Sequence, residues 1–328
     1  MVSTSSTSGR RRSDSVPDLV ERARGGEARA VARLISLVED KSPLLRDVMA
    51  ALTPHAGHAQ VIGITGSPGV GKSTSTNALV AELRKAGKRV GVLAVDPSSP
   101  FSGGALLGDR VRMQDHALDR DVYIRSMASR GHLGGLAWST PQALRVLDAA
   151  GCDVILVETV GVGQSEVEIA GLADTTMVLL APGMGDGIQA AKAGILEIGD
   201  IYVINKADRD GADQVRRDLR SMLALGDRSE GSWRPPIVKT NALTAEGLDE
   251  VVAEIESHRA WLESSGELEK RRVRRARDEI EAIAVTALRE RWGDVHGRSE
   301  LDHLAARVVA GESDPYSAAD DLLDSVPD

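Results

Sequence analysis

Short apolar runs alternate with longer amphipathic stretches through the middle of the chain. The runs are rich in valine, isoleucine and leucine, which is typical of strands that are buried on both faces of a parallel sheet. The stretches between them have the three- and four-residue spacing of helices, and glycine bounds several of them. The pattern predicts an α/β fold, a parallel sheet with helices on both faces. Strands are predicted at Val61–Thr65, Val90–Val95, Val154–Val157, Thr176–Leu180, Ile201–Ile204 and Ile237–Lys239.

Helical patterns flank this alternating region on both sides. Apolar residues recur at helical spacing from Pro17 to about Ala51, and a polar segment with Pro54 and Gly57 then reads as a linker. Beyond Gly266 the pattern is helical and highly charged. We therefore predict four parts: a disordered tail at 1–16, an N-terminal helical segment with its linker at 17–58, a central α/β domain at 59–263 and a C-terminal helical extension at 264–328.

Composition narrows the class of protein. The net charge is −9 at pH 7, and the aromatic residues are 4 tryptophans, 3 tyrosines and 1 phenylalanine. The negative charge argues against general affinity for nucleic acid or an anionic membrane, and few aromatic rings remain for stacking bases. The basic run at 270–277 has acidic neighbours, which favours a helix face or a subunit contact over a nucleic-acid site. No apolar run in the sequence is as long as the about 18 residues that a membrane-spanning helix needs.

The cysteine content and the N-terminus bear on the compartment. Cys152 is the one cysteine, so the chain has no internal disulfide that would need an oxidising compartment. Residues 1–16 contain serine and arginine but lack the apolar core of a secretory signal. A short organellar presequence has a similar composition, and that alternative stays open. We expect a cytoplasmic protein.

A phosphate-binding motif follows the first predicted strand. Residues 66–73 read GSPGVGKS, which matches G-x-x-x-x-G-K-[ST] between a strand and a helix, and this setting disfavours a chance glycine-rich turn. Its backbone amides and the helix N-terminus would face the phosphates. We expect Lys72 to reach the β- and γ-phosphates and the Ser73 hydroxyl to bind Mg²⁺. The predicted phosphate-binding residues are Gly66, Ser67, Pro68, Gly69, Val70, Gly71, Lys72, Ser73 and Thr74.

A second motif predicts which base is bound. The sequence NKAD at 205–208 follows a predicted strand, and the Asp208 carboxylate can accept two hydrogen bonds from the N1 and N2 edge of guanine. Adenine offers no such pair of donors, so an aspartate there discriminates against it. After the next strand, the loop that contains Asn241, Ala242 and Leu243 is placed to offer a main-chain amide to the guanine O6. The predicted base-side residues are Asn205, Lys206, Asp208, Asn241, Ala242 and Leu243; an ordinary strand-end turn is the alternative.

Carboxylates near strand ends predict a magnesium site. Asp96 and Glu158 each follow an apolar run, and Asp109 follows a glycine-rich stretch. With the Ser73 hydroxyl these oxygens can hold Mg²⁺ directly or through water. For Asp109 a solvated loop acid is the alternative. The amide of Gly161 is predicted to reach the γ-phosphate.

No general base stands out for hydrolysis, which suits phosphoryl transfer because positioning and charge do most of the work there. The candidate catalytic residues are Lys72, Glu158, Gln164 and Lys192. Gln164 could orient the attacking water. Lys192 is either a solvated helix lysine or a cation supplied to the nucleotide, and the sequence does not choose between these. The histidines and Cys152 form no cluster with the spacing of metal ligands.

Four segments together resemble the MeaB/ArgK family of P-loop GTPases, which includes the MMAA proteins of animals. They are GSPGVGKST at 66–74, VDPSSPFSGGALLGDRVRM at 95–113, ETVGVGQSE at 158–166 and NKAD at 205–208, and the likeness extends roughly from Pro17 to Asp328. The resemblance implies a Mg²⁺-dependent enzyme that hydrolyses GTP to GDP with its GTPase domain at 59–263. It implies Mg²⁺ held around Ser73, Asp96, Asp109 and Glu158, and a homodimer formed through the extension at 264–328.

The same resemblance implies a partner. Members of this family act as chaperones of adenosylcobalamin-dependent methylmalonyl-CoA mutase: they gate loading of the cofactor, protect the mutase and help to reactivate it. Two alternatives stay open. One is a kinase or ATPase linked to transport of basic amino acids such as arginine and ornithine. The other is a metal-delivery GTPase, although such proteins usually carry cysteine or histidine ligands that this chain lacks.

Overall fold

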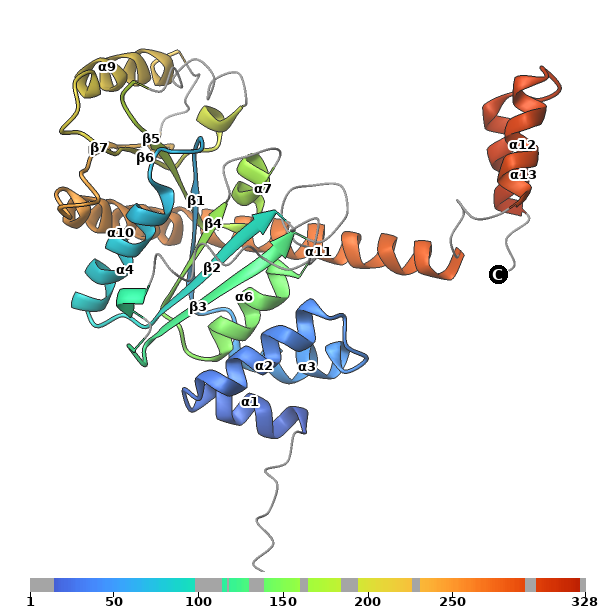
Figure 1. Cartoon of the computed structure of the whole chain (residues 1–328), viewed down its shortest axis with the longest axis horizontal. Coiled ribbons are helices and arrows are strands. Elements are labelled where there is room, and N and C mark those ends of the chain that lie inside the picture. The colour runs from blue at the N-terminus through green and yellow to red at the C-terminus, as the bar shows by residue number, and fades with distance from the viewer. Residues whose placement is uncertain are drawn as a thin grey trace, which may run out of the picture. The chain divides into compact units, whose positions relative to one another are not determined.

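The computed structural model describes residues 15–97, 114–116, 118–129, 139–159, 165–183, 194–225, 231–292 and 299–324. The chain divides into two compact units, Met1–Arg272 and Val273–Asp328. The first unit contains the sheet and the helices packed on it (Figure 1). No helix within the described ranges is long and apolar enough to cross a membrane.

A parallel sheet of seven strands forms the centre of the first unit, in the order β3-β2-β4-β1-β5-β6-β7. All neighbouring strands run parallel. All six predicted apolar runs are strands, so the predicted α/β fold is confirmed. The strands are β1 (Gln60–Thr65), β2 (Val90–Pro97), β3 (Val122–Ser129), β4 (Val154–Thr159), β5 (Thr175–Leu180), β6 (Ile201–Ile204) and β7 (Ile237–Lys239).

Strand β3 is the one that the apolar pattern does not predict. It lies at the edge of the sheet beside β2. Tyr123 and Met127 face one core, whereas Ile124 packs against the other. Arg125 and Ser126 interrupt the apolar run, and the Arg125 guanidinium forms an ion pair with Glu39, the last residue of helix α2 (Ala28–Glu39). An edge strand pairs with a neighbouring strand along one edge only, so it tolerates this polar interruption. The same interruption hides the strand from a search for continuous apolar runs.

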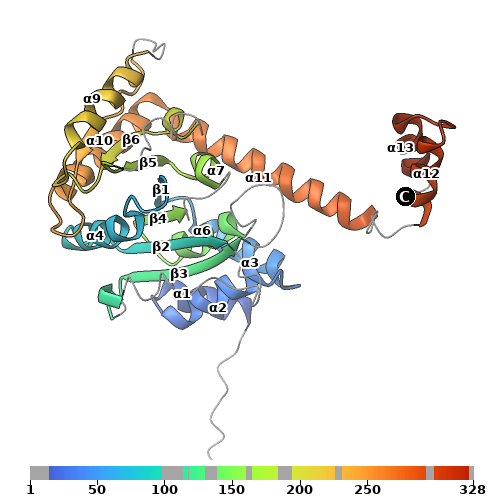
Figure 2. The same cartoon turned by 45° about the horizontal axis from the view of Figure 1, so that its top comes forward.

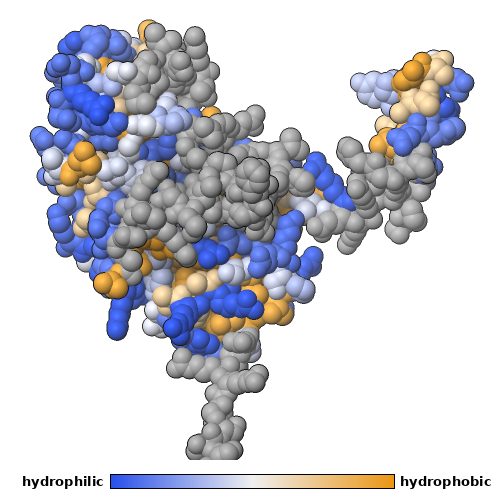
Figure 3. All heavy atoms as spheres, viewed as in Figure 1, coloured by the Kyte–Doolittle hydropathy of each residue, from blue (hydrophilic) through white to orange (hydrophobic). Residues whose placement is uncertain are grey.

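Helices cover both faces of the sheet, as Figures 1 and 2 show. The N-terminal helices α1, α2 and α3 share one core with α6 and the strands β2 and β4. Helices α4 and α10 pack on the opposite face, and α9 covers β5 and β6. In the view of Figure 3 the surface over α9 is hydrophilic, whereas apolar side chains are visible beside the N-terminal helices. The helices of the first unit are α1 (Val16–Arg24), α2 (Ala28–Glu39), α3 (Leu45–Leu52), α4 (Lys72–Lys85), α6 (Thr140–Ala149), α7 (Ser165–Leu172), α9 (Ala212–Leu223) and α10 (Leu248–Ser265).

Helix α11 (Glu267–Trp292) begins in the first unit and continues into the second. The second unit also contains α12 (Ser299–Val309) and α13 (Pro315–Asp324), which contact each other. Apolar residues are exposed along α11. Exposed apolar surface of this kind is typical of a helix that packs against a partner. The exposed apolar residues are Val273, Ile280, Ile283, Val285 and Leu288.

Two aspartates at the start of strands β5 and β6 bind arginines from the first turns of α11. The Asp200 carboxylate accepts two hydrogen bonds from the Arg271 guanidinium, at 2.8 and 2.9 Å. Asp174 pairs with Arg272 at 3.1 Å. The Asp174 and Asp200 side chains are only 1% and 10% exposed, so each buried charge needs a close partner of opposite sign. We name these four residues the aspartate–arginine clamp. The basic run at 270–277, predicted as a helix face or a subunit contact, thus supplies two contacts within its own chain.

The linker between α3 and β1 is held from two sides. The Asp148 carboxylate accepts backbone hydrogen bonds from Gly57, His58 and Ala59. The Arg272 guanidinium donates to the carbonyl oxygens of Gly57 and Ala59. The clamp therefore joins the start of α11 to the sheet and also to the segment that connects the N-terminal helices with the sheet.

His258 of α10 is fully buried beside the clamp. Its Nε2 lies 3.4 Å from Asp200 Oδ1, and its Nδ1 lies 2.9 Å from the Thr175 hydroxyl. The rings of Trp233 and Trp261 lie 4.7 and 5.8 Å from the imidazole, measured between centroids. Burial lowers the pKa of His258 to about 4 although Asp200 opposes this. The imidazole is therefore neutral at physiological pH.

Candidate functional site

The predicted phosphate-binding loop lies between β1 and α4, in the setting that its motif requires. Strand β1 ends at Thr65 and α4 begins at Lys72. Gly66 and Gly71 adopt positive φ angles of 140° and 96°. A Cβ atom at Gly66 would overlap the Leu179 carbonyl oxygen, and one at Gly71 would lie 2.5 Å from Asn205 Nδ2. Glycine is therefore required at both positions, for the backbone angles and for the space.

Lys72 is buried within this loop. Its Nζ donates hydrogen bonds to the carbonyl oxygens of Gly66, at 2.5 Å, and Ser67, at 3.2 Å. Burial lowers the pKa of Lys72, and the carboxylates of Glu158 and Glu166 oppose that shift. The ammonium group thus lies between the loop carbonyls and two acidic side chains, where its positive charge is available to a phosphate.

Two of the predicted magnesium ligands lie side by side. The Ser73 hydroxyl donates a hydrogen bond of 2.5 Å to Glu158 Oε1. Glu158 is buried near the end of β4, in register with Ile64 of β1 and Ala94 of β2. A hydroxyl and a carboxylate are oxygen donors of the kind that Mg²⁺ prefers, so these residues fit that ion. No cluster of three or more His, Cys, Asp and Glu side chains with metal-site geometry occurs within the described ranges.

Other predicted residues cannot be located in this way. The backbone of Asp96 belongs to β2, which neighbours β4 in the sheet, but its side chain lies outside the described part of the structure. Asp109, Gly161, Gln164 and Lys192 also lie outside the described residues. Their predicted roles stay predictions.

The two predicted base-side segments are joined to the phosphate loop by side chains of the NKAD motif. Asn205 Nδ2 donates to the Val70 carbonyl oxygen at 2.9 Å, and its Oδ1 accepts the Ala242 amide hydrogen at 3.0 Å. Lys206 Nζ donates to the Gly69 carbonyl oxygen at 2.6 Å. Asn205 therefore links three loops that lie far apart in the sequence.

The residues expected to face a base are open to solvent. Asp208 is exposed, and Leu243 is 86% exposed. The Asn241 side chain accepts the Leu243 amide hydrogen at 3.1 Å, which fixes the turn of this loop. Thr74, in the first turn of α4, is likewise exposed. A carboxylate and an apolar side chain on neighbouring loops suit the polar edge and the face of a purine.

Glu166 is a residue of this site to which the sequence analysis assigns no role. It lies in the first turn of α7 and is 7% exposed. Burial raises its pKa, and the charge of Lys72 opposes that shift. The sequence signal that could have pointed to Glu166 is its position at the end of the segment ETVGVGQSE. The burial of its side chain depends on how α7 packs, and the motif alone does not predict that packing.

Comparison with known proteins agrees with this geometry. The family model for methylmalonyl-CoA mutase-associated GTPase MeaB matches residues 31–295. A relative from Pyrococcus abyssi, named as a GTPase, is 48% identical over 313 residues, which are 95% of this chain and 97% of the relative. The mouse methylmalonic aciduria type A homolog, a mitochondrial protein, is 36% identical over 266 residues, which are 80% of this chain and 64% of the mouse protein.

A solved structure shows the same fold. The crystal structure of a LAO/AO transport system kinase has a TM-score of 0.75 and 27% sequence identity, and the match covers 96% of this chain and 99% of that one. The family match extends over the phosphate loop, the NKAD motif and the strands that carry them. The chain therefore belongs to the MeaB family of methylmalonyl-CoA mutase-associated GTPases, and it is a GTP-hydrolysing enzyme of the P-loop class.

Proposed function

We propose that this GTPase is a chaperone of adenosylcobalamin-dependent methylmalonyl-CoA mutase, which couples GTP binding and hydrolysis to cofactor loading, protection and reactivation. The observation that carries the proposal is the match of residues 31–295 to a family described by its association with this mutase. The name of the mouse relative, which refers to methylmalonic aciduria, supports the same partner.

The proposed nucleotide site uses residues that already lie together. The loop amides at 66–71 and the N-terminus of α4 receive the phosphates, and Lys72 Nζ contributes a positive charge beside them. Asp208 selects guanine through two accepted hydrogen bonds, while Asn205 and Lys206 hold the base-side loops against the phosphate loop. These hydrogen bonds join the loops without a nucleotide, which would reduce the entropic cost of binding one across them.

The Ser73 hydroxyl and the Glu158 carboxylate are the residues that would hold Mg²⁺, with Asp96 and Asp109 as further predicted ligands. When bound, the ion neutralises charge on the β- and γ-phosphate oxygens. The Ser73–Glu158 hydrogen bond keeps both oxygens within one small volume. Gly161, Gln164 and Lys192 are proposed to act on the γ-phosphate and the attacking water.

A homodimer is part of the proposal. The exposed apolar residues of α11 support it, because a partner helix would remove them from water. Light scattering tests this point directly: a mass of one chain, 34.8 kDa, would refute the dimer.

The chaperone role is tested by GTP hydrolysis with and without the methylmalonyl-CoA mutase of the same organism at equal concentration. We expect a slow basal rate that rises when the mutase is added, because contact with the partner would position the catalytic residues around the γ-phosphate. Lys72→Ala serves as the control and should be inactive in both conditions. If the mutase neither changes the rate nor binds in either nucleotide state, the partner assignment is wrong, while the GTPase activity stands.

The transport-kinase alternative takes its support from the name of the solved relative. It predicts transfer of the labelled γ-phosphate from nucleotide to a basic-amino-acid-binding protein. Release of the label only as inorganic phosphate would exclude it.

A further inference from the structure

A polar pocket lies at the end of the sheet opposite the phosphate loop. It is lined by residues just before three strands: His58 precedes β1, Lys88 precedes β2 and Asp153 precedes β4. The phosphate loop instead follows the last residue of β1. Because β1 has six residues, the two places are separated by roughly 20 Å of strand. The volume of the pocket is about 610 Å³, within the range of small-molecule sites.

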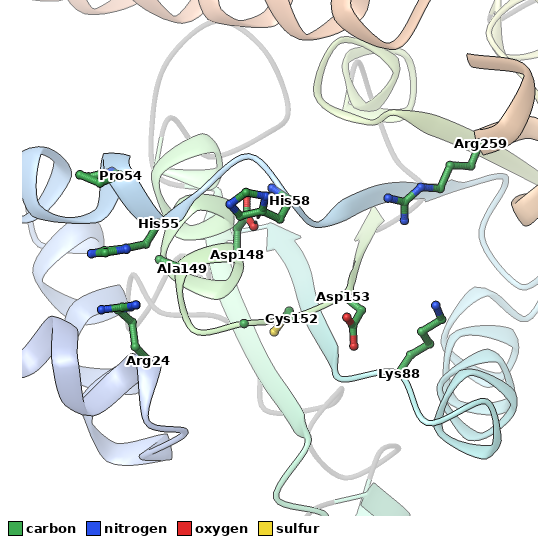
Figure 4. Close-up of a pocket in the computed structure, with 11 residues that line it drawn as sticks. Arg24, Pro54, His55, His58, Lys88, Asp148, Ala149, Cys152, Asp153 and Arg259 are labelled. Atoms are coloured by element: carbon green, nitrogen blue, oxygen red, sulfur yellow. Dashed lines mark hydrogen bonds between the residues drawn. The ribbon is translucent and has the colours of Figure 1, made fainter. Parts of the chain in front are cut away.

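Basic side chains converge on both ends of this pocket (Figure 4). At one end Arg24, the last residue of α1, points toward His55. At the other end the Lys88 ammonium and the Arg259 guanidinium of α10 point toward one another. An anion placed between two positively charged groups is attracted to both. Three separate parts of the fold thus contribute cations to one cavity.

The existing partners of these cations leave room for a ligand. Arg24 and Arg259 pair with Glu21 and Glu263 of their own helices, and both pairs are substantially exposed. Exposed pairs of this kind contribute little and exchange readily. Lys88 has no ion-pair partner within the described part of the chain. A guanidinium has five N–H donors, so each arginine can bind an anion as well as its neighbour.

The two acidic residues of the pocket lie between its basic ends (Figure 4). Asp148 accepts the backbone hydrogen bonds of the linker, and Asp153 Oδ2 accepts the Arg89 amide hydrogen at 2.7 Å. Much of their negative charge is therefore satisfied by the backbone. A carboxylate has about four lone-pair sites, so each keeps acceptor capacity that hydroxyl groups can use.

We propose that this pocket binds a small polyhydroxylated molecule that carries a phosphate group at each end. One phosphate lies between Lys88 and Arg259, the other lies beside Arg24 and His55, and hydroxyl groups between them donate to Asp148 and Asp153. The site is independent of the nucleotide and of the proposed mutase partner. Its recognition is electrostatic at the ends and hydrogen-bonded in the middle, which selects a bisphosphate over a monophosphate.

Fructose 1,6-bisphosphate is a suitable probe because it has this arrangement of groups. Binding is measured by calorimetry on the full chain saturated with GDP and Mg²⁺, so that the phosphate loop is already occupied. We expect saturable binding that is at least about tenfold tighter than that of fructose 6-phosphate, since one charged end is lost in the monophosphate. Lys88→Ala and Arg259→Ala should each weaken the bisphosphate about tenfold and leave the affinity for GDP unchanged.

Arg220→Ala is the matched control, because it removes one exposed positive charge from α9, an element that does not line the pocket. It should bind the probe like the unmodified protein. The inference is overturned if the GDP-saturated protein does not bind the bisphosphate, or if mono- and bisphosphate bind equally. It is also overturned if the two pocket variants bind as the control does.

Discussion

Replacing Arg271 with methionine should destabilise the first unit by about 2 to 3 kcal/mol. The methionine keeps much of the packing volume, but it removes two hydrogen bonds to Asp200 and a third, of 2.9 Å, to the Asp174 carbonyl oxygen. Breaking a buried ion pair from one side costs about 3 to 5 kcal/mol because it leaves an uncompensated charge. The Arg271 side chain is 27% exposed, so water can reach the vacated space and the expected loss lies below that range.

Thermal unfolding followed by tryptophan fluorescence suits this prediction. Trp233 donates its indole N–H to the Asp200 carbonyl oxygen at 2.7 Å, so one of the fluorophores reports on the clamp itself. A loss of this size should lower the unfolding temperature by roughly 4 to 10 °C in a unit this large. Lys270→Met is the matched control, because Lys270 pairs with Glu267 on the helix surface and its side chain is 65% exposed. The control should shift stability by less than about 0.5 kcal/mol.

A double-mutant cycle separates the charge effect from lost packing. Asp200→Asn keeps an oxygen that can accept the Thr176 amide hydrogen, which Asp200 now accepts at 2.8 Å. Combined with Arg271→Met it removes the stranded carboxylate, so the double variant should lose about 1 to 2 kcal/mol less than the sum of the single variants. Additive losses, or an Arg271→Met protein as stable as the Lys270→Met control, would refute the clamp as a stabilising ion pair.

Three further predictions concern pH and the nucleotide site. Because the pKa of buried His258 is lowered to about 4, protonation favours the unfolded chain, and the free energy of unfolding should fall by up to about 3 kcal/mol as the pH drops from 6.5 to 4. His258→Phe should flatten this part of a pH–stability curve, and an unchanged slope would contradict the assignment. Asp208→Asn should shift the preference from guanine toward xanthine nucleotides in competition binding, and an unaltered preference for GTP would exclude its proposed role. Lys72→Ala should lose most nucleotide binding by calorimetry while its circular dichroism spectrum stays native; retained affinity would show that its ammonium group does not contact the phosphates.

Local chemistry made the sheet and the phosphate loop predictable from the sequence. The six predicted strands are continuous apolar runs, because both of their faces are covered by helices. The loop at 66–73 is a local motif in which positive φ angles at Gly66 and Gly71 favour glycine. Features of this kind leave their whole signal in a short stretch of sequence.

Features that depend on distant contacts were not predictable. Arg271 and Asp200 are 71 positions apart, and a run of arginines on a charged helix gives no sign of which ones turn toward the sheet. Glu166 is buried because α7 packs against the strands β1, β4 and β5. The pocket at the opposite end of the sheet draws its cations from α1, α10 and the turn before β2. In each case, tertiary packing decides what the side chain contacts.

The direction of the parallel strands explains why the two ends of the sheet have different chemistry. At the ends where the strands finish, a helix begins with free amide hydrogens, and the loop before α4 presents them toward the predicted phosphates. At the ends where the strands start, helices finish with free carbonyl oxygens, which favour cations. Arg89 satisfies such a carbonyl by donating to Ala150, the residue that caps the end of α6. The clamp uses Arg271 and Arg272 at the same edge to hold buried aspartates. Lys88 and Arg259 point toward one another there without capping a helix, and this is the arrangement that the proposed anionic ligand would use.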